Sequence, residues 1–247
     1  MPFLTQISNV RLAETVDRAY TVFRLPRPAD LAVDKPYGIP PETETRMLAQ
    51  GQRDISLDDL RIWHHPHFSP DSAQDAVRWV LPKNLECLSA GHWIYHAGNS
   101  IALIRLTETG FPNAYKPAEQ ELMKEFALRL TTAFLEAPAH YEAAFNGVDE
   151  ILCMFALGGL DLGPVLSHLA SHPTEQLVQA LAPGGHVTAL GRDPFWESGK
   201  QLDVADAWYT SNAMELRLID LALNESAPGP VRAHAEMIAD DIRARRR

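Results

Sequence analysis

Residues 52–88 read QRDISLDDLRIWHHPHFSPDSAQDAVRWVLPKNLECL and contain two well-marked helix starts. In Ser56-Leu57-Asp58-Asp59, a capping serine is followed by acids at the positive end of the helix dipole. Ser69-Pro70-Asp71 combines a capping serine, a proline at the first helical position and an acid. We therefore predict a short helix that ends near Trp63 and a second helix from Ser69, which Pro82 is expected to break or kink.

Helical signals recur along the rest of the chain, because prolines and glycines bound segments whose apolar residues repeat at helical spacing. The predicted helices cover residues 10–23, 41–50, 117–137, 138–146, 148–157, 164–171, 174–182, 203–224 and 230–245. We find no fixed repeat period of the kind that marks solenoid proteins. The expected fold is mainly α, built as an irregular helical bundle or as an array of helix pairs.

Residues 93–106, WIYHAGNSIALIRL, are the best candidate for a small β-hairpin. Two apolar runs flank Ala97-Gly98-Asn99-Ser100, a sequence that suits a hairpin turn. A helix through Ile101–Leu106 competes with this interpretation, because a short apolar run does not reveal its period. We expect residues 1–247 to form a single mainly helical domain, with a candidate internal boundary near 107–117.

The composition limits the classes of function that we expect for this protein. The chain has 247 residues, 46% of them hydrophobic, and a net charge of -10 from 32 acids and 22 bases. An acidic surface repels nucleic acids and anionic membranes and attracts basic proteins, although it also serves solubility alone. Cys87 and Cys153 lie in apolar surroundings and are expected to be buried thiols. With no signal peptide and no long apolar run, we expect a cytoplasmic bacterial protein.

Several segments of the first third occur together in a recognisable order. Val16-Asp17-Arg18-Ala19-Tyr20 is followed by a proline-rich loop, then by Phe68-Ser69-Pro70 and by an Arg78-Trp79 stretch that ends in Leu81-Pro82. This order resembles a family of uncharacterised small bacterial helical proteins. The resemblance extends to the helix at 117–136, and the chain from about Val148 lies outside it. It implies a helical fold, and no catalytic residue carries over from it.

Histidines are the strongest candidates for metal chemistry, because neutral imidazoles bind zinc. Three groups stand out in the sequence: His64-His65-Pro66-His67, His92 with His96, and His168 with His172. The four-residue spacing of the pairs places both rings on one face of a helix. No pair contains the glutamate of the H-E-x-x-H pattern, so exposed or structural histidines are the competing interpretation.

Other catalytic motifs are missing from the sequence. It contains no G-x-S-x-G elbow for a serine nucleophile, and its glycine clusters lack the lysine of a phosphate-binding loop. We therefore expect Gly158-Gly159 to end a helix. The acid pairs Asp149-Glu150 and Asp240-Asp241 have no obvious partners, and we interpret them as solvated helix faces.

The stretch around Arg192, Phe195 and Trp196 is polar and irregular, so an exposed tryptophan there would suit a protein interface. The alternative is that this loop folds back and buries the ring. These observations favour a non-catalytic, protein-binding role without a cofactor, in the form of an immunity- or antitoxin-like inhibitor of a basic enzyme. The alternatives are a zinc-dependent hydrolase built on His64, His65, His67, His168 and His172, and a helical-array adaptor.

Overall fold

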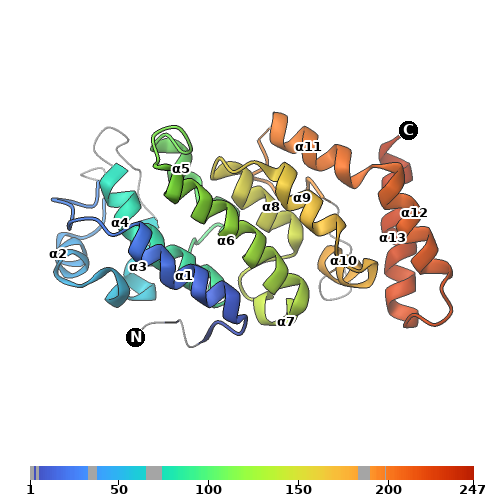
Figure 1. Ribbon diagram of the computed structural model, residues 1–247, viewed down its shortest axis with the longest axis horizontal. Coiled ribbons are helices and arrows are strands. Elements are labelled where there is room, and N and C mark those ends of the chain that lie inside the picture. Colours follow the sequence, from blue (N-terminus) through green and yellow to red (C-terminus); the bar gives the residue numbers. More distant parts are fainter. Residues whose placement is uncertain (1–2, 4–5, 33–37, 65–73, 183–189, 198) are drawn as a thin grey trace.

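The computed structural model describes residue 3 and residues 6–32, 38–64, 74–182, 190–197 and 199–247. This part of the chain is mainly helical and contains no β-strand. Figure 1 shows that the helices follow one another along the long axis, from α1–α4 at one end to α12 and α13 at the other. The prediction of a mainly α fold is confirmed.

The first three helices begin where the sequence signals place them, and α4 follows them. Their bounds are α1 Val10–Val22, α2 Pro41–Ala49, α3 Leu57–His64 and α4 Gln74–Ser89. Ser56 caps α3, since its hydroxyl accepts a hydrogen bond of 3.1 Å from the backbone N–H of Asp59. The predicted start at Ser69-Pro70-Asp71 lies outside the described residues, and α4 is described from Gln74 onward.

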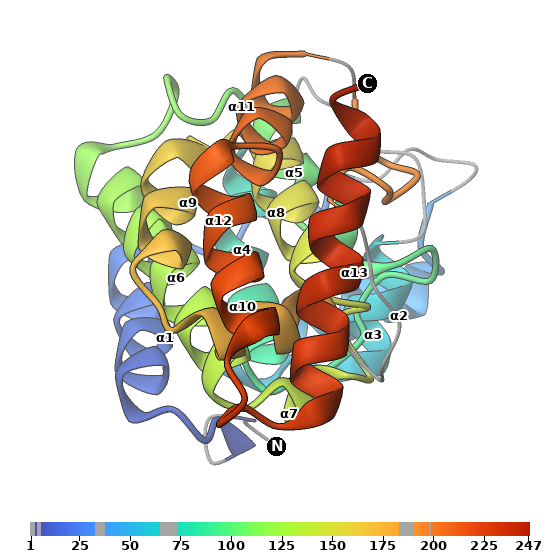
Figure 2. The same ribbon diagram turned by 90° about the vertical axis from the view of Figure 1, so that its right-hand side faces the viewer.

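The remaining helices build the middle and the C-terminal end. They are α5 Ile104–Glu108, α6 Pro117–Glu136, α7 Pro138–Tyr141, α8 Val148–Leu157, α9 Leu162–Ala170, α10 Thr174–Leu181, α11 Lys200–Tyr209, α12 Asn212–Leu223 and α13 Gly229–Arg245. The long helix α6 packs against α1 on one side and against α8, α9 and α10 on others. Figure 2 shows α12 and α13 side by side, and both also pack against α10.

One large cluster of buried apolar side chains runs through these helices, from Ile7 near the start to Ile242 in α13. It includes fully buried aromatic side chains such as Trp63, Phe126 and Phe155. Members lie on both sides of the candidate boundary near 107–117. A smaller cluster around Cys153 lies apart from it, and it is this smaller cluster that borders the site described below.

Local structure differs from expectation at three places. Of the two outcomes expected at Pro82, the break does not occur, because α4 continues to Ser89 and the buried residues around Pro82 hold the helix together by packing. The helix expected over 203–224 is two helices, because Ser211 caps α12 by accepting a hydrogen bond from the N–H of Met214. Residues 93–106 form no hairpin. They contain a short 3-10 turn, Asn99–Ile101, and the start of α5.

Asn99 explains why the hairpin does not form. Its side-chain oxygen accepts a hydrogen bond from the N–H of Ile94, and its amide donates to the carbonyls of His92 and Ala144. These bonds satisfy the N–H of Ile94, which a hairpin would have paired across its strands, and tie the loop to carbonyls outside the expected hairpin. The residue expected in the turn therefore organises a compact loop instead.

None of the helices in the described part of the chain is long and apolar enough to cross a membrane. Both cysteines are buried free thiols, as expected. Burial raises the pKa of Cys87 to about 12 and raises the pKa of Cys153 as well, which keeps both thiols protonated and unreactive at neutral pH.

Candidate functional site

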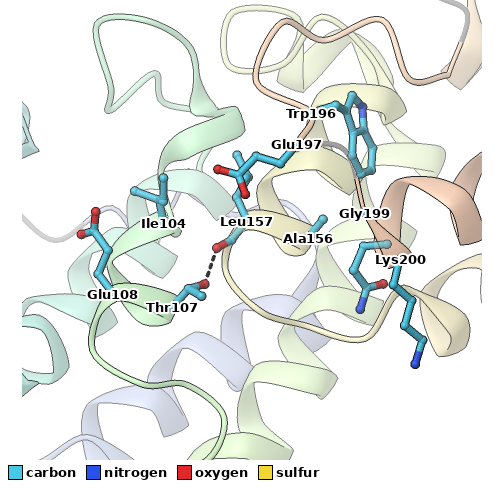
Figure 3. Close-up of a pocket in the computed structure, with 10 residues that line it drawn as sticks. Ile104, Thr107, Glu108, Ala156, Leu157, Trp196, Glu197, Gly199 and Lys200 are labelled. Carbon is cyan, nitrogen blue, oxygen red and sulfur yellow. Dashed lines mark hydrogen bonds between the residues drawn. The ribbon is translucent and has the colours of Figure 1, made fainter.

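An open cavity of about 460 Å³ lies where the end of α8 meets α5 and the residues that precede α11 (Figure 3). Its lining combines apolar side chains with charged ones, namely Ile104, Leu157, Trp196, Glu108, Glu197 and Lys200. Glu108 and Glu197 are exposed, whereas the Trp196 ring is half-buried. The cavity therefore offers an apolar wall with carboxylates beside it.

Two glycines let α5 approach the end of α8 and so shape this cavity. The Thr107 hydroxyl donates a hydrogen bond to the backbone carbonyl of Leu157, drawn as a dashed line in Figure 3. A Cβ atom on Gly158 would lie 2.9 Å from the Cβ of Leu103, and Gly159 has a φ of +78°. Gly158-Gly159 thus ends α8, as predicted, and also permits a contact that larger residues would block.

Trp196 is held in place by a buried carboxylate in the first turn of α8. Its indole N–H donates a hydrogen bond of 2.8 Å to Asp149. The backbone N–H groups of Gly191, Arg192 and Asp193 donate to the same carboxylate over 2.6, 3.0 and 2.8 Å. Successive N–H groups that converge on an anion form a nest, and the φ of +80° at Gly191 belongs to that geometry. Asp149 therefore determines where the Trp196 loop lies.

The expectation that Asp149 and Glu150 are solvated is wrong, because Asp149 is 1% exposed and Glu150 is 4% exposed. Burial raises the pKa of both carboxyls, and the hydrogen bonds that they accept oppose the rise. Glu150 accepts from the backbone N–H groups of Asn99 and Asn146 over 2.8 and 2.7 Å. Among the described residues, no lysine or arginine forms an ion pair with Asp149 or Glu150.

The smaller apolar cluster links this cavity to a neighbouring loop. Ile101, Cys153 and Leu157 are its buried members. Partly buried side chains pack against them from three directions, namely Tyr95, Ile104, Phe195 and Trp196. Aromatic rings that are half-buried on a small cluster near the surface are typical of protein interfaces.

The interface residues suggested by the sequence have different surroundings. Phe195 packs against the smaller cluster, while Trp196 contacts both clusters and lines the cavity. The loop thus folds back onto α8 without burying the Trp196 ring completely. Arg192 stays exposed, with its guanidinium 4.0 Å from the carboxylate of Asp241. Of this trio, only Trp196 lines the cavity.

His64 is buried at the end of α3, only 2% exposed. Its Nε2 atom lies 3.1 Å from the side-chain oxygen of Asn84. Burial and the nearby cation of Arg105 lower the pKa of His64 to about 3, against the effect of the Asn84 contact. The ring is therefore neutral at physiological pH.

His168 and His172 have partners of their own on and near α9. His168 contacts the Thr132 hydroxyl at 2.7 Å, and His172 contacts the carbonyl of His168 at 2.9 Å. Their ring centroids lie 4.6 Å apart at the end of α9. His65 and His67 lie outside the described residues. Within the described part of the chain, no group of three or more histidine, cysteine or acidic side chains is placed to hold a metal ion.

Sequence reasoning missed Glu108, Glu197 and the buried role of Asp149. Glu108 and Glu197 are ordinary acids in polar stretches, and nothing local marks them. One local signal pointed to a structural role for Asp149, because a negative charge is favoured in the first turn of a helix. Its hydrogen-bond partners lie more than 40 residues further along, and only the tertiary structure brings them to it.

Comparisons of this chain with protein-family models, with curated proteins and with solved structures gave no match.

Proposed function

We propose that this protein binds a basic protein partner through the cavity between α5, α8 and α11, and that it acts as an immunity- or antitoxin-like inhibitor of a basic enzyme. The observation that carries the proposal is the presence of Glu108, Glu197 and the open part of the Trp196 ring in one cavity. This combination suits a protruding lysine or arginine side chain.

The chemistry of such a contact follows from the lining. The apolar stem of a long basic side chain packs against Ile104 and Leu157, while its charged end stays close to the carboxylates. The face of an indole ring attracts a cation, which adds to the attraction of Glu108 and Glu197. Lys200 at the edge opposes only part of that negative charge, since two acids line the cavity with it.

The charge of the whole chain supports the same partner. A net charge of -10 attracts a basic protein over several ångströms before contact and raises the rate of association. The attraction weakens with salt, because the Debye length is about 8 Å at physiological ionic strength. An acidic protein that covers the active site of a basic enzyme would block its substrates, and this is the inhibitory role proposed.

We expect charge reversal in the cavity to abolish capture of the partner. Wild-type protein and the double variant E108K/E197K are used as baits in lysate of the native host. A basic protein is expected on the wild-type bait and not on the variant. With the captured protein purified, the variant is expected to raise the Kd roughly 100-fold, about tenfold for each reversed charge. The enzymatic activity of the partner, measured with and without wild-type protein, tests inhibition directly.

The matched control is E14K/E236K, which changes the net charge by the same amount on the exposed surfaces of α1 and α13. This variant is expected to retain the basic partner, with only a slower association. Equal loss with both double variants would show that capture reflects overall charge alone and would contradict the proposed contact surface. A partner that binds E108K/E197K as well as wild type, or that stays fully active when bound, would also contradict it.

A further inference from the structure

Trp93 is the most exposed aromatic side chain of the loop between α4 and α5, at 46% exposure. Its backbone is fixed, because the Arg61 guanidinium donates a hydrogen bond of 2.9 Å to its carbonyl oxygen. The neighbouring N–H of Ile94 donates to Asn99 over 3.0 Å. A large ring is thus exposed to solvent on a well-anchored stretch of chain, where it is accessible to a ligand.

A cavity of about 340 Å³ adjoins one side of Trp93 and is separate from the cavity near Trp196. His96 and Asn146 help to line it, and two carboxylates, Glu142 and Glu150, line it as well. The size is ample for the charged end and part of the stem of an arginine side chain. An aromatic wall beside carboxylates is the arrangement that recognises a cation.

The negative charge in this cavity has no cationic counterpart in the described part of the chain. Neither Glu142 nor Glu150 forms an ion pair within 4.0 Å there, although acids elsewhere commonly do. Glu150 is 4% exposed and its chain neighbour Asp149 is 1% exposed, while the half-buried Asp193 lies close enough to act on Glu150 through its charge. Hydrogen bonds from Asn99 and Asn146 offset only part of the cost of burying the Glu150 carboxylate, so a cationic ligand would gain from the remaining negative charge.

Trp93 also lines a second cavity, which has different chemistry. This cavity of about 340 Å³ is lined by Ile62, Ile94 and Tyr95 as well, with Arg61 as its charged residue. No carboxylate lines it among the described residues. A cation is therefore attracted to the side of Glu142 and Glu150 and disfavoured on the side of Arg61. Of the two cavities that Trp93 lines, the one with Glu142 and Glu150 therefore suits a cation and the one with Arg61 does not.

We propose that the cavity bounded by Trp93, Glu142 and Glu150 binds the guanidinium group of an arginine side chain presented by the protein partner. The inference deepens the proposed function, because it names a second contact with the same basic partner. Arginine fits better than lysine, since a planar guanidinium stacks on the Trp93 face while it donates hydrogen bonds to Glu142. Glu150 contributes its charge, because its oxygens already accept hydrogen bonds from Asn99 and Asn146.

The test uses a small probe in place of the partner. Nα-acetyl-arginine amide is titrated into the full-length protein, and the Nε1–H signals of the tryptophans are followed by NMR. The Trp93 signal, assigned by its loss in Trp93→Phe, is expected to shift saturably. The matching citrulline amide has the same shape without the charge, and it is expected to bind about tenfold more weakly or less.

Two variants and one control locate the binding. Glu142→Gln removes a rim charge without disturbing the core, and it is expected to weaken arginine amide binding about tenfold. Glu197→Gln removes an acid from the other cavity, and it is expected to leave the Trp93 titration unchanged. The inference is overturned if citrulline amide binds equally well, if only Trp196 shifts, or if Glu142→Gln binds like wild type. Those results would leave capture through Glu108 and Glu197 intact, so the two proposals fail separately.

Discussion

Replacement of Asp149 by alanine is expected to lower the free energy of unfolding by about 3–5 kcal/mol, roughly 1 kcal/mol for each N–H donor that loses its acceptor. The reason is the number of donors that depend on this carboxylate. The N–H groups of Gly191, Arg192 and Asp193 and the indole N–H of Trp196 would all lose their acceptor. Unsatisfied buried donors keep the desolvation cost without the compensating bond. Urea denaturation followed by circular dichroism measures this loss.

Asp149→Asn is also expected to be destabilising, because its amide group turns an N–H toward backbone donors. The matched control is Asp203→Asn, since Asp203 also lies in the first turn of a helix but is exposed. The control is expected to change the stability by less than about 0.5 kcal/mol. If Asp149→Ala were as stable as Asp203→Asn, the nest would not hold the loop. A change in tryptophan emission in Asp149→Asn that is lost when Trp196 is replaced by phenylalanine would show that the Trp196 ring has moved.

Acid is expected to destabilise the folded protein through His64. Its pKa is about 3 when folded, against an ordinary value of 6.5, because burial disfavours the charged ring. Below pH 6.5 the unfolded chain takes up a proton that the folded protein does not, so the folded state loses about 1.4 kcal/mol per pH unit. The loss continues until the pH approaches 3. At pH 4.5 it amounts to about 3 kcal/mol relative to neutral pH.

The difference in unfolding free energy between wild type and His64→Gln isolates this effect. Glutamine removes the titrating ring and keeps a polar group next to Asn84. Any change in unfolding free energy that comes from the substitution itself is therefore the same at every pH. The raised pKa values of Asp149 and Glu150 act in the opposite direction, because the folded protein then binds protons that the unfolded chain does not. They are present in both proteins and cancel in the difference. A wild-type curve parallel to that of His64→Gln between pH 6.5 and 4 would refute the prediction.

The positions of most helices could be predicted because their signals are local. Ser56 caps α3, Pro117 opens α6, and Gly158 follows the last residue of α8, all within a few residues of the helix they bound. The errors arose where packing or a distant partner outweighed the local signal. Pro82 stays inside α4 because its neighbours are buried, and Asn99 replaces a hairpin with a loop because it bonds to Ala144, 45 residues away.

The sequence by itself determined the mainly helical fold, most helix ends and the acidic character of the chain. Periodicity and capping depend on residues that are close in the sequence, and the net charge depends only on the composition. Only the tertiary structure decided which acids are buried and which face a cavity. Asp149 and Glu108 look alike in the sequence, yet one is enclosed by a loop from beyond α10 and the other stands at the edge of an open cavity. The physical reason is that the environment of a carboxylate depends on residues far away in the chain, which reach it only when the helices pack.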